Sequence, residues 1–452
     1  MTDILLQSAT GVAGELRAGR LSARELVKRV LERVDAVNPG LNAVVELGRE
    51  SALRAADDAD RVLARGEQAG PLLGVPMTVK EAIRVAGMRS TWGDPAFAEH
   101  VADRDAVAVS RLRSAGAVLF GTTNVAQMLA DVVECVNPLY GRTVNPWDRT
   151  RSPGGSTGGG AAAVAAGMSF VEYGSDLTGS IRIPASFCGV YGLKPTAGTV
   201  PLDGFQPPGP PAGPTEMAYL SAVGPLARSA ADLRTALRAT AGPSGAEAKA
   251  YRWRLAPARH ARLADFRVGV VLDHPAAAVS SDVGAVLSDA VDSLAAAGAT
   301  IVEGWPEGVD PIGQAESFGF QVRQFFAFHG GDPDFAGLPA VVEQHDRRMA
   351  ARAAWDRYFS EVDVLLCPAV CTTAFRHLGP DDERPYPELG FWIAHASLAG
   401  LPALSAPAGR TPGGLPVGVQ VLGPRHEDDT AITFAELAAE VIGGFTPPPV
   451  AG

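Results

Sequence analysis

Two serines on glycine-rich turns have the sequence settings that most suggest chemistry in this chain. Ser156 stands in the run PGGSTGGG and Ser180 in the run GSDLTGSIR, 24 positions further on. Glycine opens backbone conformations that other residues avoid, so such turns bring amide N–H groups close to a small ligand. A serine hydroxyl becomes an effective nucleophile when a nearby base removes its proton. The two runs therefore suggest a shared hydroxyl network that needs a base.

Lys80 is the base that the sequence favours. Lysine occurs at only four positions, which are Lys28, Lys80, Lys194 and Lys249, and arginine supplies the other basic residues. Lys80 ends an apolar run over 72–79 that is typical of a buried strand. Burial lowers the pKa of a lysine, and a neutral amine accepts a proton. The eight histidines are scattered, and none falls in either serine motif.

Other interpretations of the GGSTGGG run stay open from the residues alone. A phosphate-binding loop normally closes on a Lys-Ser/Thr pair, which is missing here. A nucleophile elbow of the form G-x-S-x-G leaves a β-strand, and the preceding TVNPWDRTRSP is poor strand sequence. Either serine alone could simply cap a helix.

Composition and charge narrow the class of protein. The chain has 452 residues, of which 46% are hydrophobic and 20% charged, with a formal net charge of -11. This balance is typical of a soluble globular protein, and the acidic excess argues against direct nucleic acid binding. The start MTDILLQSATGVAGELRAGRL has no basic segment followed by an apolar one, and the longest apolar stretch, near 161–171, is too short to span a bilayer. We expect a cytoplasmic protein without a membrane partner.

The cysteines give no sign of a disulfide framework or a metal site. They are too few for the first and lack the paired spacing of the second. We expect buried free thiols and no metal at the four positions, which are Cys135, Cys188, Cys367 and Cys371.

The elements that must position these residues alternate between strand and helix. Ser22 and Glu25 form a capping-box pattern, and the apolar spacing that follows predicts a core-facing helix over 22–38. The alternation predicts an α/β fold with a mostly internal sheet. Further predicted helices cover 106–115 and 282–297, and predicted strands cover 75–79, 117–121, 169–174, 267–273, 299–304, 362–368 and 415–423.

The segment PLDGFQPPGPPAGPT, residues 201–215, interrupts this rhythm. Its prolines exclude a helix interior or a central strand. Because the strand-helix alternation continues on both sides, we expect a long surface loop within one domain that spans 1–452. Loops of this kind often border active sites.

Seven segments, in order, resemble the amidase-signature family. They run over nearly the whole chain and are LSARELVKRVLERVDAVNPGLNAVV, LLGVPMTVKEAI, DAVAVSRLRSAGAVLFGTTN, NPWDRTRSPGGSTGGGAAAVAAG, GSDLTGSIRIPASFCGVYGLKPT, GPLARSAADL and LAGLPALSAPAGRTPGGLPVGVQVLG. The sequence is identified as a member of this family. The resemblance implies a single domain whose central mixed, twisted sheet is covered by helices on both faces.

The resemblance also implies roles for the two serines and the lysine. Ser180 is expected to be the nucleophile that forms an acyl-enzyme, and Ser156, in a cis peptide, is expected to bridge it to Lys80, the ultimate base. Protons would pass along this chain in both directions. The chemistry needs no metal, nucleotide or organic cofactor.

The surrounding residues both match and depart from the family pattern. The resemblance implies that Ser175 supports the nucleophile, and Thr157 and Glu81 stand where the family usually has Ser and Asp. Thr178 replaces the first of two usual glycines, which would strain the turn if that position needs a positive φ. The implied oxyanion hole consists of the backbone N–H groups of Leu177, Thr178, Gly179 and Ser180.

The function implied is hydrolysis of a small carboxamide to a carboxylate and ammonia or an amine, by a monomer or homodimer. Alternatives are the A-type subunit of a tRNA-dependent amidotransferase, an esterase or acyl transferase on the same scaffold, and a nucleotide-binding protein. We expect the walls of the substrate pocket in the segment 127–137, with Met128, Leu129 and Asp131 as candidates, and in the proline-rich loop after Val200. The apolar pair suggests an aryl or alkyl acyl group.

Overall fold

The computed structural model describes residues 3–208, 220–330, 334–379 and 381–451. Its helices are α1 (Ala9–Arg17), α2 (Ala23–Val37), α3 (Arg49–Ala64), α4 (Val107–Ser114), α5 (Gly158–Ala165), α6 (Arg182–Cys188), α7 (Ala230–Thr240), α8 (Glu247–Ala250), α9 (Ser281–Ala296), α10 (Pro311–Gly330), α11 (Leu338–Tyr358), α12 (Tyr386–Ala399) and α13 (Asp428–Ile442). Its strands are β1 (Val44–Leu47), β2 (Pro76–Lys80), β3 (Val118–Thr123), β4 (Val136–Asn137), β5 (Gly141–Arg142), β6 (Val171–Asp176), β7 (Tyr191–Lys194), β8 (Ala222–Ala227), β9 (Arg267–Val270), β10 (Thr300–Glu303), β11 (Val364–Pro368), β12 (Ala403–Arg410) and β13 (Pro416–Leu422).

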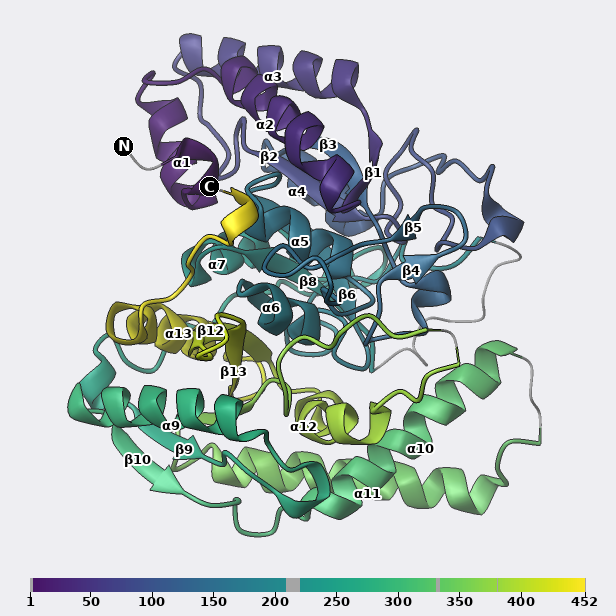
Figure 1. Ribbon diagram of the computed structural model, residues 1–452, viewed down its shortest axis with the longest axis vertical. Coiled ribbons are helices and arrows are strands. Elements are labelled where there is room, and N and C mark those ends of the chain that lie inside the picture. The colour runs from purple at the N-terminus through teal and green to yellow at the C-terminus, as the bar shows by residue number, and fades with distance from the viewer. Residues whose placement is uncertain (1–2, 209–219, 331–333, 380, 452) are drawn as a thin grey trace.

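A mixed sheet runs through the molecule, as predicted (Figure 1). Within the described ranges it has eleven strands in the order β1-β3-β2-β6-β8-β7-β12-β13-β11-β9-β10, and β4 and β5 form a separate ribbon. Strand β2 lies between β3 and β6, parallel to both, and β9 lies parallel to β10 and β11. The other pairings in the large sheet are antiparallel.

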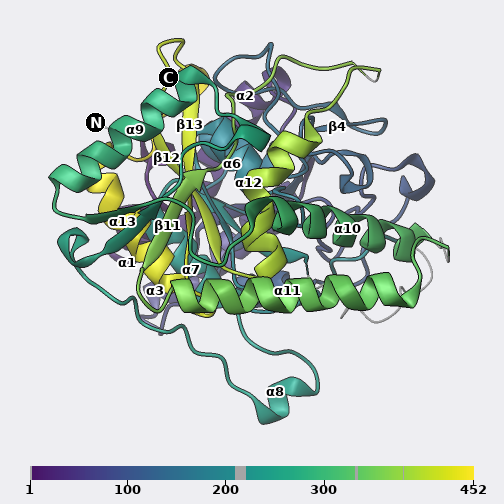
Figure 2. The same ribbon diagram turned by 90° about the horizontal axis from the view of Figure 1, so that it is seen from below.

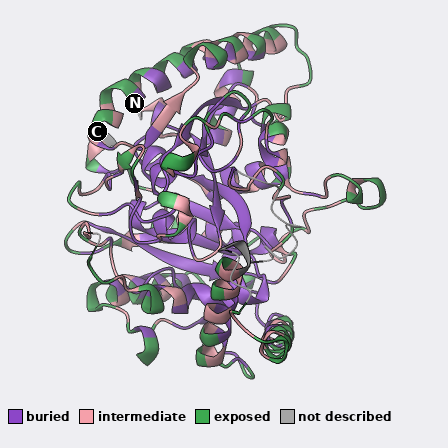
Figure 3. Cartoon of the chain, turned by 90° about the vertical axis from the view of Figure 1, so that its right-hand side faces the viewer, coloured by how far each residue is buried: buried purple, intermediate pink, exposed green. Residues whose placement is uncertain are grey.

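Helices cover both faces of this sheet. Successive side chains of a strand point to opposite faces. On β6, Glu172 packs against Gly160 of α5, whereas the hydroxyl of Tyr173 bonds to that of Thr240 on α7. Helices α5 and α7 therefore lie on opposite faces. Figure 3 shows the buried strands in the middle of the molecule and the exposed residues concentrated on its outer helices.

The predicted elements match the structure closely. Helix α2 begins after Ser22, whose Oγ accepts a hydrogen bond from the Glu25 N–H at 3.0 Å. Each of the nine further predicted helices and strands coincides with an observed one to within a few residues at either end. The predictions left out many elements, among them β1, β7, β8, β12, α3, α7 and the helices α10–α13.

Two peripheral segments stand out in Figure 2. Helices α10 and α11 pack together and against α12, while the short α8 projects from the body of the molecule. Of the predicted loop at 201–215, residues 201–208 are irregular and the rest lie outside the described residues. Within the part of the chain that is described, no helix has the length and apolar character needed to cross a membrane.

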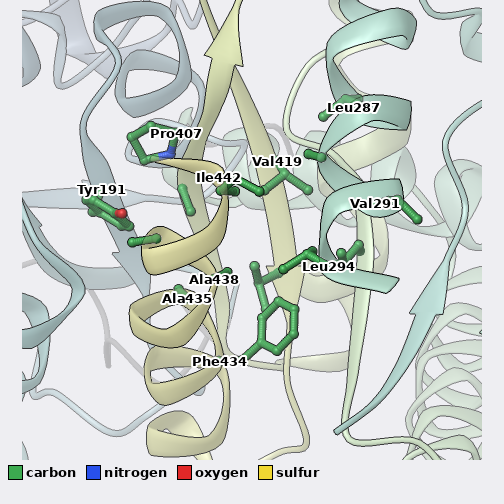
Figure 4. A pocket seen from close by; sticks show the side chains of 15 residues that line it. Tyr191, Leu287, Val291, Leu294, Pro407, Val419, Phe434, Ala435, Ala438 and Ile442 are labelled. Atoms are coloured by element: carbon green, nitrogen blue, oxygen red, sulfur yellow. The ribbon is translucent and has the colours of Figure 1, made fainter. Parts of the chain in front are cut away.

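The packing between α9, α13 and the sheet is nearly complete. A cavity of about 10 Å³ remains there, enclosed by apolar side chains such as Leu287, Val419 and Phe434 (Figure 4). This is about the space that one water molecule needs, and such a lining offers a water few hydrogen-bond partners. We assign this cavity to packing.

We predict that Ser22→Ala lowers the free energy of unfolding by about 1 kcal/mol, because the Glu25 N–H loses its acceptor at the start of α2. Ser280 is the matched control, since it precedes α9 without a side-chain cap bond. Urea denaturation should show a smaller loss for Ser280→Ala. Equal losses for the two variants would contradict this account of the cap.

Candidate active site

Lys80 is the last residue of β2, and its side chain is completely buried. Its Nζ lies 2.7 Å from Ser156 Oγ, 2.9 Å from Ser175 Oγ and 3.0 Å from Thr157 Oγ1. Three hydroxyls can thus accept the three N–H bonds of the ammonium form. The amine that the sequence singled out as a base therefore contacts the serine that it was expected to contact.

Burial lowers the pKa of Lys80 to about 7, although the negative groups near it, among them Glu172 and Asp176, act in the opposite direction. Desolvation is the larger effect because no solvent reaches the side chain. A substantial fraction of the amine is therefore neutral at neutral pH. The neutral form has two N–H bonds and a lone pair, so one of its three hydroxyl neighbours must donate to it.

Ser156 lies on a turn that is closely packed. The peptide bond between Gly155 and Ser156 is cis. A β-carbon on Gly158, Gly159 or Gly160 would come within 2.6 Å of Cys135, Asn124 or Glu172, respectively. The glycines thus permit close packing, and the first turn of α5 is buried. No named strand precedes this turn between β5 and α5, so a nucleophile elbow is excluded here.

Ser180 lies on the turn between β6 and α6. Its carbonyl oxygen accepts a hydrogen bond from the Thr157 N–H at 3.2 Å, which joins the two glycine-rich turns. Ser180 and Ser156 line the same cavity. The positive φ of this turn falls on Gly179, at 99°, and Thr178 is not among the residues with positive φ. Replacing the usual glycine by Thr178 therefore brings no backbone strain.

A buried ion pair, which no sequence pattern indicated, holds the Ser180 turn. Arg182 donates to Asp176 from Nε at 3.0 Å and from Nη2 at 2.8 Å, and both side chains are fully buried. The carboxylate also accepts from the N–H groups of Gly179, Ile181 and Arg182. Burial opposes the charged form, but the charge and hydrogen bonds of Arg182 outweigh it, so the pKa of Asp176 falls to about 2. The motif GSDLTGSIR contained both residues.

The four backbone N–H groups expected at the oxyanion hole differ in whether they already have a hydrogen-bond acceptor in the protein. The Gly179 N–H donates to Asp176 Oδ1 at 3.0 Å. Within the described ranges, the N–H groups of Leu177, Thr178 and Ser180 have no protein acceptor. These three donors, on the turn that carries Ser180, are available to an anionic oxygen.

Glu172 is a second buried carboxyl near the amine. Its oxygens accept hydrogen bonds from Thr78 Oγ1 at 2.5 Å and from Thr123 Oγ1 at 2.6 Å. Burial raises the pKa of Glu172 to about 7, and Lys80 acts in the opposite direction. The sequence showed this residue only as the end of an apolar stretch, so its place beside the lysine was missed.

A cavity of about 70 Å³ opens beside the serines. Of the pocket residues expected from the sequence, Met128 and Leu129 line it. Asp131 is not among the lining residues, and its carboxylate instead accepts from the Val133 N–H and pairs with Arg384. Phe205 also lines the cavity and comes from the proline-rich loop that was expected to form a pocket wall. The sequence patterns did not indicate the other aromatic residues of the lining, which are Trp92, Phe325 and Phe326.

Potential metal ligands do not gather in the described residues, where no three His, Cys, Asp or Glu side chains form a set that could hold a metal ion. The four cysteines are free and buried, as expected. Cys135 packs against Gly158 at the start of α5, and burial raises the pKa of its thiol to about 11. Its thiol is therefore neutral at ordinary pH.

Comparison with known proteins places this fold and site in a family. The Amidase family model matches residues 25–328 and 315–432, so the chain belongs to the amidase family. A relative from Prochlorococcus marinus (strain MIT 9303), the A subunit of glutamyl-tRNA(Gln) amidotransferase, is 32% identical, and the match covers 96% of this chain and 98% of the relative.

Two solved structures of hydrolytic enzymes are also similar. 6-Aminohexanoate cyclic dimer hydrolase superimposes with a TM-score of 0.83 at 27% identity, over the whole of both chains. The native peptide amidase from Stenotrophomonas maltophilia gives a TM-score of 0.80 at 27% identity, over 99% of each chain. The mixed sheet flanked by helices is therefore the fold of amidase-signature enzymes.

We predict that the side chains of Lys80 and Lys194 titrate near pH 7 in protein labelled with ¹³C at the lysine ε-carbon. Burial lowers the pKa of both Lys80 and Lys194 to about 7, so each is charged below that pH and neutral above it. Lys80→Met and Lys194→Met should each remove one of these two signals. A Lys80 signal that keeps its charged-state position up to pH 9 would contradict the expected base.

We predict that Arg182→Met lowers the free energy of unfolding by about 3–5 kcal/mol, because it leaves the buried Asp176 carboxylate without its cation. Adding Asp176→Asn should recover part of the loss in chemical denaturation. The folded-state pKa of Asp176 lies below its ordinary value of 3.8, so the carboxylate stabilises the fold above about pH 4, and this contribution disappears as the pH falls toward 2. A single variant within about 1 kcal/mol of wild type would contradict this role.

Proposed function

We propose that this protein hydrolyses a small carboxamide through an acyl-enzyme on Ser180, with Ser156 and Lys80 as the proton path. The observation that carries this proposal is the buried Lys80 amine, 2.7 Å from Ser156 Oγ and with a pKa of about 7. A base with a pKa near the working pH is the most effective one. The family membership of the chain supports the same chemistry.

The hydrogen bonds around the amine favour Ser156 as its proton donor. Thr157 Oγ1 lies 3.3 Å from the carbonyl oxygen of Ser175, to which it donates. This leaves Ser156 and Ser175 to donate to the neutral amine, and Ser156 is the closer of the two. Once its proton points at Lys80, the Ser156 oxygen has a lone pair free to accept the Ser180 proton.

The reaction then has two halves. Ser180 Oγ attacks the amide carbon while its proton moves to Ser156, and the Ser156 proton moves to Lys80. The C–N bond breaks as the same path returns a proton to the departing nitrogen, which leaves as ammonia or an amine. Water attacks the acyl-enzyme, gives its proton to the same path and releases the carboxylate and free Ser180. The three available N–H groups of the Ser180 turn would stabilise the oxyanion.

We predict that an activated acyl ester labels Ser180, as mass spectrometry of the intact and digested protein would show. Ser180→Ala should remove the label, and Ser156→Ala and Lys80→Met should slow labelling roughly a thousandfold or more, because each breaks the proton path. Ser110→Ala, an exposed serine on α4, is the control. Labelling of the Ser180→Ala variant at another residue would overturn the assignment.

The labelling rate should rise with pH through about 7, because Lys80 acts as a base only after losing its proton. Glu172→Gln removes a negative charge that raises the pKa of Lys80, so this rise should move to lower pH. Stopped-flow release of the ester's leaving group measures both profiles. An unchanged profile in Lys80→Met would contradict the proposed base.

A second candidate is the A-type subunit of a tRNA-dependent amidotransferase, favoured by the 32% identity over nearly the whole chain to proteins of that name. That role needs companion subunits, a charged tRNA and glutamine as the ammonia source. Glutamine-dependent ammonia release by the purified chain, increased by companion subunits, would favour it. Full carboxamide hydrolysis by the chain alone, without any activity toward glutamine, would exclude it. The same acyl-enzyme is also compatible with ester cleavage or acyl transfer.

A further inference from the structure

Both hydroxyl groups and apolar side chains line the cavity beside the serines. The hydroxyls belong to Ser156, Ser175, Thr178, Ser180 and Ser221. The apolar side chains are Trp92, Met128, Leu129, Leu177, Phe205, Phe325 and Phe326. The reacting amide must approach Ser180, so a group attached to that amide would lie against the apolar side chains. This inference rests on the proposed function.

Hydrogen bonds connect the Trp92 part of the cavity lining to the residue that follows Lys80. Glu81 follows Lys80 directly, and its carboxylate accepts from the Trp92 N–H at 2.9 Å and from the Thr91 N–H and hydroxyl at 2.6 Å. The Trp92 carbonyl in turn accepts from the Met128 N–H at 2.8 Å. The Trp92 ring stacks on Phe205 with a centroid distance of 5.2 Å and an interplanar angle of 20°.

Three of the residues that line the cavity have a strained backbone conformation. Trp92, Met128 and Leu129 have φ of 56°, 50° and 57°, in the left-handed region that residues other than glycine seldom adopt. Residues held in this region cluster at ligand sites. All three of these residues line the same cavity.

Helix α10 supplies another part of the cavity lining. Phe325 and Phe326 lie edge to face, with ring centroids 5.5 Å apart at 86°. Phe326 remains 48% exposed although it lines the cavity. A large apolar side chain in this position gains most if a ligand covers it.

Among the described lining residues, no charged side chain is left free to pair with a charged ligand. Asp176 is the one ionisable side chain in the described lining, and it is already held by Arg182 and three backbone N–H groups. A charged group on the substrate would lose water here without finding a charged partner. Glutamine carries an ammonium and a carboxylate, so this lining suits it poorly.

We propose that the substrate is an uncharged aromatic carboxamide, whose ring lies between the Trp92–Phe205 stack and the phenylalanines of α10. The cavity of about 70 Å³ has room for roughly five water molecules. Phe326 is the residue of this set that selects the ring, since its contact with the ligand replaces exposure to solvent.

The test uses binding as well as turnover. Calorimetry on the full-length Ser180→Ala variant measures the Kd of benzamide without any reaction. Benzamide should bind at least tenfold more tightly than acetamide or than benzamide with a charged para substituent, either carboxylate or aminomethyl. Charged and uncharged rings that bind equally would overturn the inference.

The second part of the test measures kcat/KM for variants of Phe326. In the otherwise wild-type enzyme, Phe326→Ala should lower kcat/KM for benzamide roughly tenfold and that for acetamide less than twofold, because only the ring reaches this side chain. Phe326→Leu should lie between the two proteins. Phe320→Ala, on the same helix but packed on Phe335 instead of lining the cavity, is the control. Equal effects on both substrates would contradict the assignment of Phe326.

Failure of the inference is distinguishable from failure of the proposed function. Labelling of Ser180 by a small aliphatic activated ester does not depend on an aromatic ring. If Ser180 is labelled but benzamide has no advantage over acetamide, the substrate class is wrong and the nucleophile stands. If Ser180 is never labelled, the proposed function itself is wrong.

Discussion

The burial of one amine at the end of a central strand governs the arrangement of this site. The Lys80 side chain is not exposed to solvent, so its amine needs hydrogen-bond partners within the protein. Three hydroxyls from two other segments are these partners. The parallel pairing of β2 with β3 and β6 brings the carboxyl ends of these strands to one edge. Sheets of this kind commonly place ligand sites at that edge. The same burial that demands these partners also lowers the pKa of the amine, so that a substantial fraction is neutral at neutral pH and can accept a proton.

Sequence reasoning succeeded where local pattern and tertiary structure agree. The capping pattern of Ser22 and the apolar runs of β2, β3 and β6 are local signals, and the structure has these elements in place. Helix α12 was missed because it is buried on nearly all sides, so its apolar residues show no helical period. Strands β7, β8 and β12 were missed because β7 follows a helical motif and the other two contain proline, as Pro225 and Pro407.

The site shows the same division between local and distant information. The glycine-rich motifs singled out Ser156 and Ser180, the rarity of lysine singled out Lys80, and the likeness to a family suggested a role for each. The contacts of the two nearby carboxylates could not be predicted in this way. Glu172 accepts hydrogen bonds from Thr78 and Thr123, and Glu81 accepts one from the Thr91 hydroxyl. No motif in the sequence marks these threonines. The sequence left open whether the position of Thr178 needs a positive φ, and only the backbone shows that Gly179 has it instead. The aromatic residues of the cavity come from segments as far apart as 92 and 326, and no spacing rule connects them.

The unequal support of the cavity's two sides bears on how such enzymes diversify. The Trp92 side is tied through Glu81 to the strand that carries the amine, so a change there would disturb reactivity and selectivity together. The α10 side arrives on a pair of long helices that pack against α12 and share no hydrogen bond with Lys80. Evolution, or a protein engineer, therefore has in α10 and α11 a replaceable module with which to explore new ligands while the reaction centre is inherited unchanged.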